Sequence, residues 1–476
     1  MRSSAASDVY KRQVLGGGIA GYSAAIRASQ LGKTVALVEE EKLGGTCLHR
    51  GCIPTKSFLK SAEIYHYIQQ ASQYGIEVNE PTFHFESILK RKDKIVHQMH
   101  QGVEHLIMQN KIDVFNGKGC LLGASIFSPQ SGTVSVEYAS GESELLPNDY
   151  VLIATGSHPI ELPMLPFDHH TVLNSDDMMK LTNSPESILI IGGGVIGLEF
   201  AHLLNVLGVK VTIVEASERI LIHESEQVSR LMKQNLTKEG ITILENTAIT
   251  EEMIQRSNDS ITFNLDEPLT VEKVLVAVGR EANTDHIGLN NTKVELSNRK
   301  TIQTNEFMQT ADAHIYAAGD VIGQLQLAHV GAKEGIIAVE HMFNAQPLAI
   351  DYHQMPRCIY TQPEVASIGM TAKDAKAKGI ETSVVKAPFK ANGKALIESL
   401  DQPQGFAELV FEKTSNTFLG ASLVGPHVTE LINELSLLKF MDGSAIELGS
   451  TVHAHPSISE LLMELGLKSE NQSIHI

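Results

Sequence analysis

The chain has no tryptophan and only four cysteines among its 476 residues. So few cysteines in so long a chain exclude a secreted fold held by disulfides, and they favour a cytoplasmic protein. Basic residues are also scarce relative to acidic ones. The chain has 38 lysines and arginines and 56 aspartates and glutamates, which gives a net charge of −18. This balance argues against nucleic acid and anionic membranes as partners.

Long apolar runs are missing too. None approaches the roughly 18 residues that a membrane-spanning helix needs, and the first residues lack the apolar stretch of a signal peptide. Hydrophobic residues still make up 42% of the chain, which is ordinary for a globular protein. A chain of this length predicts several domains with large cores.

Two of the four cysteines stand close together in the segment 44–56, GGTCLHRGCIPTK. Cys47 and Cys52 can close a small disulfide ring, and such a ring beside a nucleotide can accept and return two electrons. A cysteine that only fills a core needs no such partner, so the pair suggests redox chemistry. Cys120 and Cys358 stand alone and are interpreted as buried free thiols.

A glycine-rich turn with GxGxxG spacing precedes this segment and opens a predicted helix, which is followed by an apolar strand that ends in an acid. That order is typical of a dinucleotide site, where the glycines let backbone N–H groups approach a pyrophosphate and the acid accepts from the ribose. The residues that carry the pattern are Gly16, Gly18, Gly21 and Glu39.

The pattern occurs a second time, at Gly192, Gly194, Gly197 and Glu215. Glycines needed only for helix–strand packing would not explain two acids at matching offsets, so we predict two dinucleotide domains. One nucleotide would be a nicotinamide and the other a flavin, because flavins exchange a hydride for thiol electrons. Glu215 favours NAD over NADP, since a carboxylate repels a 2′-phosphate, although the nearby Arg219 leaves NADP open.

The rest of the chain completes an α/β fold with two Rossmann-like FAD/NAD(P)-binding domains and a C-terminal α+β dimerisation domain. Apolar segments at 151–156, 274–280 and 315–320 predict further buried strands, and short apolar strands with helices follow Pro356. The predicted domains are 1–148 for FAD, 149–278 for NAD, 279–350 for a second FAD-binding segment and 351–476 for the interface.

The strand before the first glycine turn is unusual. A buried parallel strand should be apolar, but only Val14 and Leu15 are, while Lys11, Arg12 and Gln13 stand where apolar residues are expected. We hypothesise that residues 1–13 are not native and have replaced a natural first strand. The alternative is a genuine but odd N-terminal segment.

From Val14 to the C-terminus, the chain resembles the dihydrolipoamide dehydrogenase family, the flavin-dependent class I disulfide oxidoreductases of 2-oxoacid dehydrogenase complexes. The resemblance implies FAD and NAD as cofactors, a homodimer, and the lipoyl domain of an acyltransferase subunit as partner. Besides the segments above, it is carried by 154–156 (ATG), 192–200, 316–320 (YAAGD), 327–330 (LAHV), 360–364 (YTQPE) and 453–460 (HAHPSISE).

The resemblance implies catalytic roles for Cys47, Cys52, His455 and Glu460. Cys47 would exchange with dihydrolipoamide, Cys52 would lie against the flavin, and His455 would reach in from the other subunit as the base. Glu460 would orient His455; the Ser-x-x-Glu spacing at its position is also that of a helix capping box. His453 and His455 lack a third ligand, so no metal is expected, and His453 is interpreted as a supporting or packing residue.

The resemblance also implies cofactor contacts. Lys56, paired with Glu199, would lie near the flavin ring, and Asp320 would bind the ribityl or phosphate part; a solvated lysine and a plain turn aspartate are the alternatives. The other predicted cofactor contacts are Gly45, Thr46, Ala154, Thr155, Gly156, Gly279 and Ala328.

Two other functions compete with this one. A disulfide reductase for glutathione, mercury or a coenzyme A disulfide shares the scaffold, but Glu215 argues against an NADPH-linked glutathione enzyme. Mercuric reductases carry a C-terminal cysteine pair, and no cysteine follows Cys358. A non-catalytic scaffold is disfavoured because the cysteine pair, His455 and Glu460 are all present.

Overall fold

The computed structural model describes residues 12–124, 131–399 and 403–476. The chain divides into two compact units, each assembled from three stretches of sequence. The first unit comprises Met1–Thr55, Lys90–Ile160 and Arg280–Ile350, and the second comprises Lys56–Leu89, Glu161–Gly279 and Asp351–Ile476. The predicted domain boundaries stay predictions, because compact units need not coincide with folding domains.

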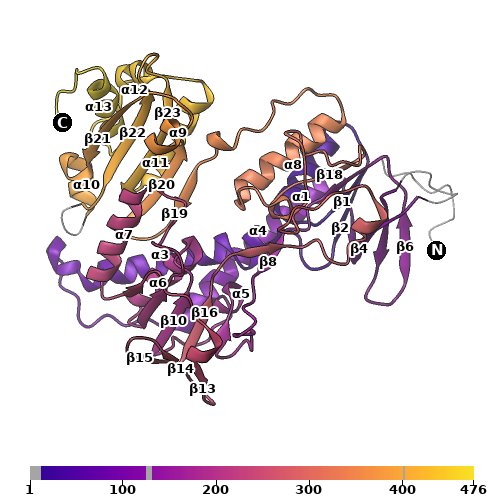
Figure 1. Ribbon diagram of the computed structural model, residues 1–476, viewed down its shortest axis with the longest axis horizontal. Coiled ribbons are helices and arrows are strands. Elements are labelled where there is room, and N and C mark those ends of the chain that lie inside the picture. The colour runs from indigo at the N-terminus through magenta and orange to yellow at the C-terminus, as the bar shows by residue number, and fades with distance from the viewer. Residues whose placement is uncertain (1–11, 125–130, 400–402) are drawn as a thin grey trace. The chain divides into compact units, whose positions relative to one another are not determined.

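The first unit is built on a five-stranded parallel sheet whose strands follow the order β18-β7-β1-β2-β3. Helices α1 and α8 pack against each other beside this sheet (Figure 1). A Cβ added at Gly335 of α8 would lie 2.4 Å from the Ala20 carbonyl oxygen, so only glycine allows this close approach. The elements are β18 (Ile315–Ala317), β7 (Tyr150–Ile153), β1 (Arg12–Leu15), β2 (Val35–Glu39), β3 (Asp113–Asn116), α1 (Ile19–Gln30) and α8 (Ala328–Met342).

Smaller elements complete the first unit. An antiparallel sheet of three strands joins β4, β5 and β6, and β8 pairs antiparallel with β17, which is distant in the sequence. Their bounds are β4 (Lys118–Leu122), β5 (Thr133–Glu137), β6 (Ser143–Leu146), β8 (Ser157–Pro159) and β17 (Arg280–Ala282), with the short helix α2 at Gly45–His49.

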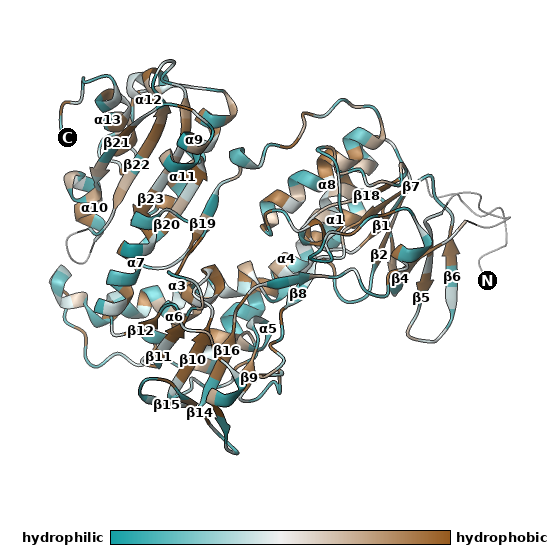
Figure 2. Cartoon of the chain, in the orientation of Figure 1, coloured by the Kyte–Doolittle hydropathy of each residue, from teal (hydrophilic) through white to brown (hydrophobic). Residues whose placement is uncertain are grey.

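The second unit repeats the arrangement with a parallel sheet of order β12-β11-β10-β16-β9. Its central strands are almost wholly apolar and buried, as Figure 2 shows for β10 and β16. The elements are β12 (Thr242–Leu244), β11 (Lys210–Val214), β10 (Ser187–Ile191), β16 (Lys273–Val276), β9 (Val172–Leu173), α5 (Ser175–Met178), α6 (Val195–Val206) and α7 (Glu226–Lys238). An antiparallel sheet of β13 (Ile254–Arg256), β14 (Ile261–Asn264) and β15 (Pro268–Val271) is added to it.

The C-terminal part of the second unit is an antiparallel sheet of order β19-β20-β23-β22-β21 with helices packed on it. This α+β texture, and with it the α/β fold class, confirms the expectation from the sequence. The elements are β19 (Arg357–Ile359), β20 (Glu364–Gly369), β21 (Thr382–Pro388), β22 (Phe406–Glu412), β23 (Phe418–Gly425), α9 (Ala372–Ala377), α10 (Gly393–Glu398), α11 (Val428–Phe440), α12 (Ala445–Ser450) and α13 (Glu460–Ser469). Two longer helices, α3 (Cys52–Gln69) and α4 (Phe85–Gln109), complete the chain.

Strand β1 includes two of the polar residues that the sequence marked as misplaced. Gln13 is fully buried, but its Nε2 donates to the carbonyl oxygens of Leu146 and Pro147, and its Oε1 accepts from Asn148 Nδ2 at 2.6 Å. Burying an amide that has these partners costs little free energy of folding. Gln13 therefore fits its position, contrary to the expectation that an apolar residue belongs there.

Arg12 does not fit in the same way. Its side chain is 2% exposed, and its three guanidinium nitrogens have no hydrogen-bond partner among the described residues. Burial lowers the Arg12 pKa to about 9, although the charges of Asp149 and Tyr150 oppose this shift. The compensation visible in the structure is the Phe343 ring, whose centroid lies 3.0 Å from Arg12 Cζ.

Among the described residues, no helix combines the length and the apolar character that crossing a membrane would require.

Candidate active site

The first glycine turn has the geometry of a phosphate-binding turn. Gly16 has a φ of +103°, and a Cβ there would lie 2.2 Å from the Ala154 carbonyl oxygen, so the position requires glycine. A Cβ at Gly21 would lie 1.8 Å from the Gly16 carbonyl oxygen, which places α1 directly against the turn. The Gly17 N–H donates to Glu39 Oε2 at 2.6 Å across 22 residues of sequence.

The second glycine turn repeats these contacts almost atom for atom. Gly192 has a φ of +115°, and a Cβ there would lie 2.4 Å from the Ala277 carbonyl oxygen. The Gly193 N–H donates to Glu215 Oε2 at 2.7 Å, again across 22 residues. A Cβ at Gly194 would meet no atom within 4 Å, so the space before the N-terminus of α6 is open to a pyrophosphate.

Arg219 is engaged with the backbone. Its Nη1 donates to the Leu221 carbonyl at 3.0 Å, and its Nη2 donates to the carbonyls of Ile222 and Glu224 at 2.9 and 3.0 Å. A guanidinium committed to three carbonyls is poorly placed to bind a 2′-phosphate. The contacts of Arg219 therefore support the preference for NAD that Glu215 predicts.

The cysteine segment lies against the first glycine turn. The Gly44 N–H donates to the Gly17 carbonyl at 2.8 Å, and a Cβ at Gly45 would lie 2.6 Å from Gly18 Cα. The two backbones can approach this closely only because both positions are glycine. The structure thus brings Cys47, on α2, to the nucleotide turn of the same unit.

Gly51 lets the chain return to Cys47 just before Cys52, and both cysteines are present as thiols in the structure. A Cβ at Gly51 would lie 3.3 Å from Cys47 Cα, so the chain passes very close to Cys47 just before Cys52 begins α3. Both cysteine side chains are half-buried. A cysteine in the first turn of a helix has its thiolate stabilised by the helix dipole, which suits a reactive pair.

The predicted pair of Lys56 and Glu199 is present in the second unit. Glu199 is 3% exposed, and Lys56 Nζ lies 2.8 and 3.0 Å from its two carboxylate oxygens. Glu199 also accepts the Tyr360 N–H at 3.1 Å, and Lys56 Nζ lies 4.7 Å from the centroid of the Tyr360 ring. Lys56 is therefore not a solvated helix lysine.

Replacing Lys56 with methionine should destabilise the protein. The variant keeps most of the side-chain stem, but among the described residues it leaves the buried Glu199 carboxylate with the Tyr360 N–H alone, and removing one partner of a buried pair costs about 3–5 kcal/mol. Because Lys56 is partly exposed, we expect a loss near the lower end of that range, measured as a lower urea midpoint. Lys60→Met is the control, since the exposed Lys60–Glu63 pair should contribute under about 1 kcal/mol. Equal effects of the two variants would contradict the assignment.

Asp320 lies just after β18, at the start of a 3₁₀ turn. It accepts a hydrogen bond from Ser157 Oγ, and Arg280 Nε lies 3.9 Å from its Oδ2. The neighbouring Gly319 N–H donates to Glu334 of α8 at 2.7 Å, and Glu334 is 1% exposed. The sequence did not assign Ser157, Arg280 or Glu334 to this site, because their contacts join segments that are far apart in the chain.

The other predicted cofactor contacts are placed by the same strands. Ala154 follows β7 and donates its N–H to the Leu15 carbonyl at 2.7 Å, while Thr155 Oγ1 donates to the Asn283 carbonyl at 2.7 Å. The remaining positions are Gly156 with a φ of +74°, Gly279 with a φ of +125°, Ala328 at the start of α8, and Thr46 within α2.

His455 and Glu460 form a pair in the second unit. His455 Nδ1 lies 2.9 Å from Glu460 Oε1, and the other carboxylate oxygen accepts the Ser457 N–H at 2.8 Å. One carboxylate therefore serves both predicted roles, half of a capping box and the orientation of His455, while Ser457 Oγ contacts Ser459 Oγ instead of capping the helix. The Ser457 N–H, followed by His455, lowers the pKa of Glu460.

This pairing sets the state of the imidazole. Because Glu460 accepts at Nδ1, that nitrogen carries the proton and Nε2 keeps its lone pair. The His455 side chain is 83% exposed, so Nε2 is open to an incoming thiol. The cysteine pair belongs to the first unit and the His455–Glu460 pair to the second.

Cys358 is chemically unlike the cysteine pair. Burial, together with the charge of Glu364, raises the pKa of its thiol to about 12, so it stays protonated and unreactive at neutral pH. Cys120 and Cys358 are half-buried rather than buried, which corrects the interpretation from the sequence. Among the described residues, no group of three or more His, Cys, Asp or Glu side chains is placed to hold a metal ion.

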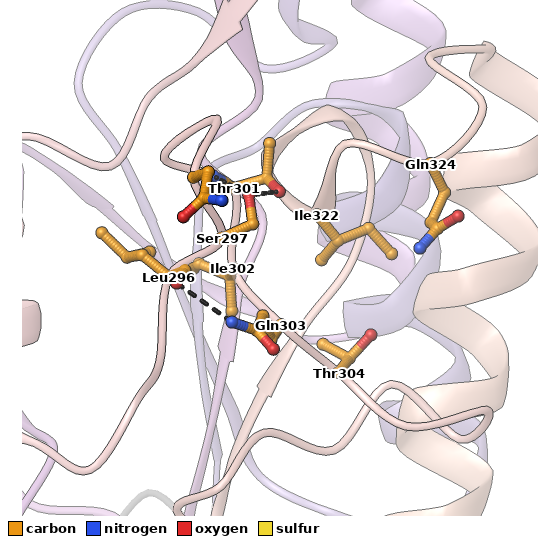
Figure 3. A pocket seen from close by; sticks show the side chains of 9 residues that line it. Leu296, Ser297, Thr301, Ile302, Gln303, Thr304, Ile322 and Gln324 are labelled. Carbon is orange, nitrogen blue, oxygen red and sulfur yellow. Dashed lines mark hydrogen bonds between the residues drawn. The ribbon is translucent and has the colours of Figure 1, made fainter.

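A separate hollow of about 440 Å³ lies on the first unit and contains none of the predicted site residues (Figure 3). Within it, Ser297 and Thr301 share a hydrogen bond, and Gln303 Nε2 donates to the Leu296 carbonyl.

Known proteins resemble this chain along almost its whole length. Residues 10–335 match the family described as pyridine nucleotide-disulphide oxidoreductase, and residues 355–465 match the dimerisation domain of that family. A dihydrolipoyl dehydrogenase of Bacillus subtilis (strain 168) is 44% identical over 472 residues, which cover 98% of this chain and 99% of that protein. A dihydrolipoyl dehydrogenase of Mycobacterium tuberculosis (strain ATCC 25618 / H37Rv) is 38% identical over 460 residues, covering 96% and 97%.

Solved structures share the fold. LpdA from Mycobacterium tuberculosis has a TM-score of 0.89 at 23% identity, covering 96% of this chain and 99% of that one. The HOCl-induced flavoprotein disulfide reductase RclA from Escherichia coli has a TM-score of 0.83 at 25% identity, with the same coverage.

Proposed function

Because the chain belongs to the pyridine nucleotide-disulphide oxidoreductase family, we propose that it oxidises dihydrolipoamide to lipoamide and reduces NAD⁺, as a dihydrolipoyl dehydrogenase with FAD. The observation that carries this proposal is the docking of the Cys47 segment on the first glycine turn through Gly44 and Gly45. A pair of cysteines held against a nucleotide turn suits electron transfer between thiols and a bound nucleotide.

The residues present fit both cofactors. The first turn, with Glu39, would hold the pyrophosphate and ribose of FAD, and the second turn, with Glu215, would hold those of NAD. Both turns expose backbone N–H groups at a helix N-terminus, and both acids lie at hydrogen-bonding distance from their turns. Bound FAD would supply two-electron transfer between the cysteine pair and NAD⁺.

The chain's own residues would carry out the thiol exchange. His455 Nε2 takes the proton of one dihydrolipoamide thiol, and the thiolate attacks Cys47 Sγ, which breaks the Cys47–Cys52 bond and leaves Cys52 as a thiolate. The second substrate thiol then attacks the mixed disulfide, releases lipoamide and leaves Cys47 reduced. The substrate loses two electrons, the cysteine pair gains them, and their passage to NAD⁺ yields NADH and a proton.

The partners follow from this chemistry. The match to a dimerisation domain supports a homodimer, in which His455 would serve the cysteine pair of the other subunit. The dithiol would be carried by the lipoyl domain of the acyltransferase of a 2-oxoacid dehydrogenase complex, and the scarcity of cysteine favours the cytoplasm.

The direct test is a steady-state assay of the purified, FAD-loaded protein with dihydrolipoamide and NAD⁺. We expect NADH formation with dihydrolipoamide, and little or none with reduced glutathione or with reduced coenzyme A. Turnover with one of those thiols but not with dihydrolipoamide would overturn the proposal and indicate a different disulfide reductase.

The second glycine turn makes a specific prediction about cofactor choice. Glu215→Ala removes an acceptor for the ribose hydroxyls and the charge that repels a 2′-phosphate. Hydrogen bonds to charged groups contribute about 1.5–3 kcal/mol, so the preference for NAD⁺ over NADP⁺ in kcat/KM should fall about 10- to 100-fold. Glu218→Ala, at an exposed neighbouring position, is the control and should leave the ratio unchanged. An unchanged ratio in Glu215→Ala would show that the carboxylate does not select the cofactor.

A further inference from the structure

A second histidine anchors the loop that carries His455. His453 lies two residues earlier, between α12 and α13, and its side chain is 5% exposed, whereas that of His455 is 83% exposed. His453 Nε2 lies 2.7 Å from Glu434 Oε1 on α11, and its Nδ1 lies 2.9 Å from the Thr451 carbonyl oxygen. A buried imidazole thus joins the loop to a neighbouring helix.

The two contacts hold the His453 ring at both of its nitrogens. The Glu434 carboxylate and the Thr451 carbonyl oxygen lie at hydrogen-bonding distance on opposite sides of the ring, so its orientation is fixed. His455 differs, because among the described residues only its Nδ1 has such a partner, and its exposed side chain leaves Nε2 open.

The loop is held from both sides of His455. On the N-terminal side, the Thr451 N–H donates to the Glu447 carbonyl of α12, and His453 reaches α11. On the C-terminal side, Glu460 at the start of α13 holds both the Ser457 N–H and the His455 ring. Because α11, α12 and α13 pack in one α+β domain, these contacts fix the loop relative to the sheet beneath it (Figure 1).

We propose that His453, through its contact with Glu434, is a positioning residue that holds the loop so that His455 keeps Nδ1 on Glu460 and presents Nε2 to the substrate. This inference rests on the proposed function, because it concerns the base of that reaction. Positioning matters because a base has to lie within hydrogen-bond reach of the proton it removes, and a displacement of about 1 Å can cost about 100-fold in rate.

The test compares two reactions of the FAD-loaded enzyme. Dihydrolipoamide with NAD⁺ requires the base, whereas ferricyanide with NADH draws electrons from the reduced flavin without thiol exchange. His453→Ala should lower kcat with dihydrolipoamide about 10- to 100-fold, with the KM for NAD⁺ and the ferricyanide rate changed less than about twofold. Glu434→Gln should reduce the first reaction in the same way, and the double variant should be no worse than the poorer single one, because both act through one contact.

The matched control is His475→Ala, which removes the ring from another His–Glu pair, between His475 and Glu464 of α13. It should leave both reactions unchanged. A His453→Ala enzyme with wild-type dihydrolipoamide turnover would overturn the inference. So would a parallel loss of both reactions together with flavin, since that marks a general structural role.

A second measurement needs no dihydrolipoamide, so it separates this inference from the proposed function. In ¹⁵N-histidine NMR, with the His455 signal assigned by its loss in His455→Gln, the wild type should show one fixed tautomer with Nδ1 protonated. His453→Ala should average the two tautomers. A fixed tautomer in both proteins would refute the positioning role, whereas a wild type inactive with dihydrolipoamide would refute only the proposed function.

Discussion

Replacing His455 with glutamine is expected to lower dihydrolipoamide-dependent NAD⁺ reduction by about 100- to 10,000-fold, the contribution that a general base typically makes. The His455 ring keeps a proton on Nδ1, through Glu460, and exposes Nε2, so it is built to take a thiol proton. Glutamine can still donate to Glu460 but cannot accept and hold a proton. The measurement is kcat for NADH formation at saturating dihydrolipoamide.

His455→Gln also shows whether a loss of activity comes from the missing base or from general damage to the structure. Electron transfer from NADH to ferricyanide bypasses the thiols, so it should change less than about twofold in His455→Gln, because the flavin and NAD turns are untouched. His475→Gln makes the same substitution in the pair that His475 forms with Glu464 of α13, and it should leave both reactions unchanged. A His455→Gln enzyme that keeps more than about a tenth of its dihydrolipoamide turnover would contradict the assignment of the base.

Replacing Arg12 with isoleucine is expected to stabilise the protein by about 1–4 kcal/mol, the gain seen when buried ionic groups give way to hydrophobic ones. The guanidinium lies in β1 with no hydrogen-bond partner among the described residues, and the face of Phe343 is its main compensation. Isoleucine suits a buried parallel strand and can pack on the same ring. The measurement is the midpoint of unfolding in urea, with the rise in fluorescence on release of FAD as the probe.

The neighbouring residue gives a matched contrast. Gln13→Val also places an apolar residue in β1, but it removes the donor to the Leu146 carbonyl and one of the two acceptors of the Asn148 amide, so it should destabilise by about 1–3 kcal/mol. If both substitutions destabilise, Arg12 has a compensating partner and the hypothesis of a non-native segment 1–13 loses its support. If Arg12→Ile stabilises the protein and Gln13→Val does not, the hypothesis that residues 1–13 are not native gains support.

The pH dependence of stability offers an independent check on Arg12. Its pKa in the folded protein is lowered to about 9 from an ordinary value of 12.5, so between those values the unfolded chain binds more protons. Stability rises with pH wherever the unfolded state binds more protons, so the cost of burying Arg12 should be relieved as pH rises above about 9. The stability gain of Arg12→Ile should therefore shrink over that window.

The two nucleotide turns could be predicted from sequence because their chemistry is local. Each turn is joined to its acid by one helix and one strand of nearly fixed length, so the spacing of 22 residues implies the contact. The His455–Glu460 pair spans only five residues and was suggested in the same way. The sequence left open whether Glu460 forms part of a capping box or orients His455. In the structure, one carboxylate oxygen accepts the Ser457 N–H and the other contacts the His455 ring.

Contacts between distant segments could not be derived from spacing. Lys56 and Glu199 are 143 residues apart, and only the family resemblance paired them. The contact between Gly319 and Glu334 and that between His453 and Glu434 depend on how helices pack on a sheet, which no local pattern fixes. Arg12 and Gln13 of β1 looked equally misplaced in the sequence. The sequence predicted that both would be buried, but it could not predict that only Gln13 would find hydrogen-bond partners among the described residues.

We claim that a cysteine pair passes electrons between dihydrolipoamide and NAD⁺ through a bound flavin. The decisive experiment is an anaerobic titration of the FAD-loaded protein with dihydrolipoamide, in which the visible spectrum is recorded. We expect long-wavelength absorbance to grow with about one equivalent of dithiol, as a Cys52 thiolate forms beside the oxidised flavin, and NADH to appear once NAD⁺ is added. A flavin spectrum that does not respond to dihydrolipoamide would contradict the claim.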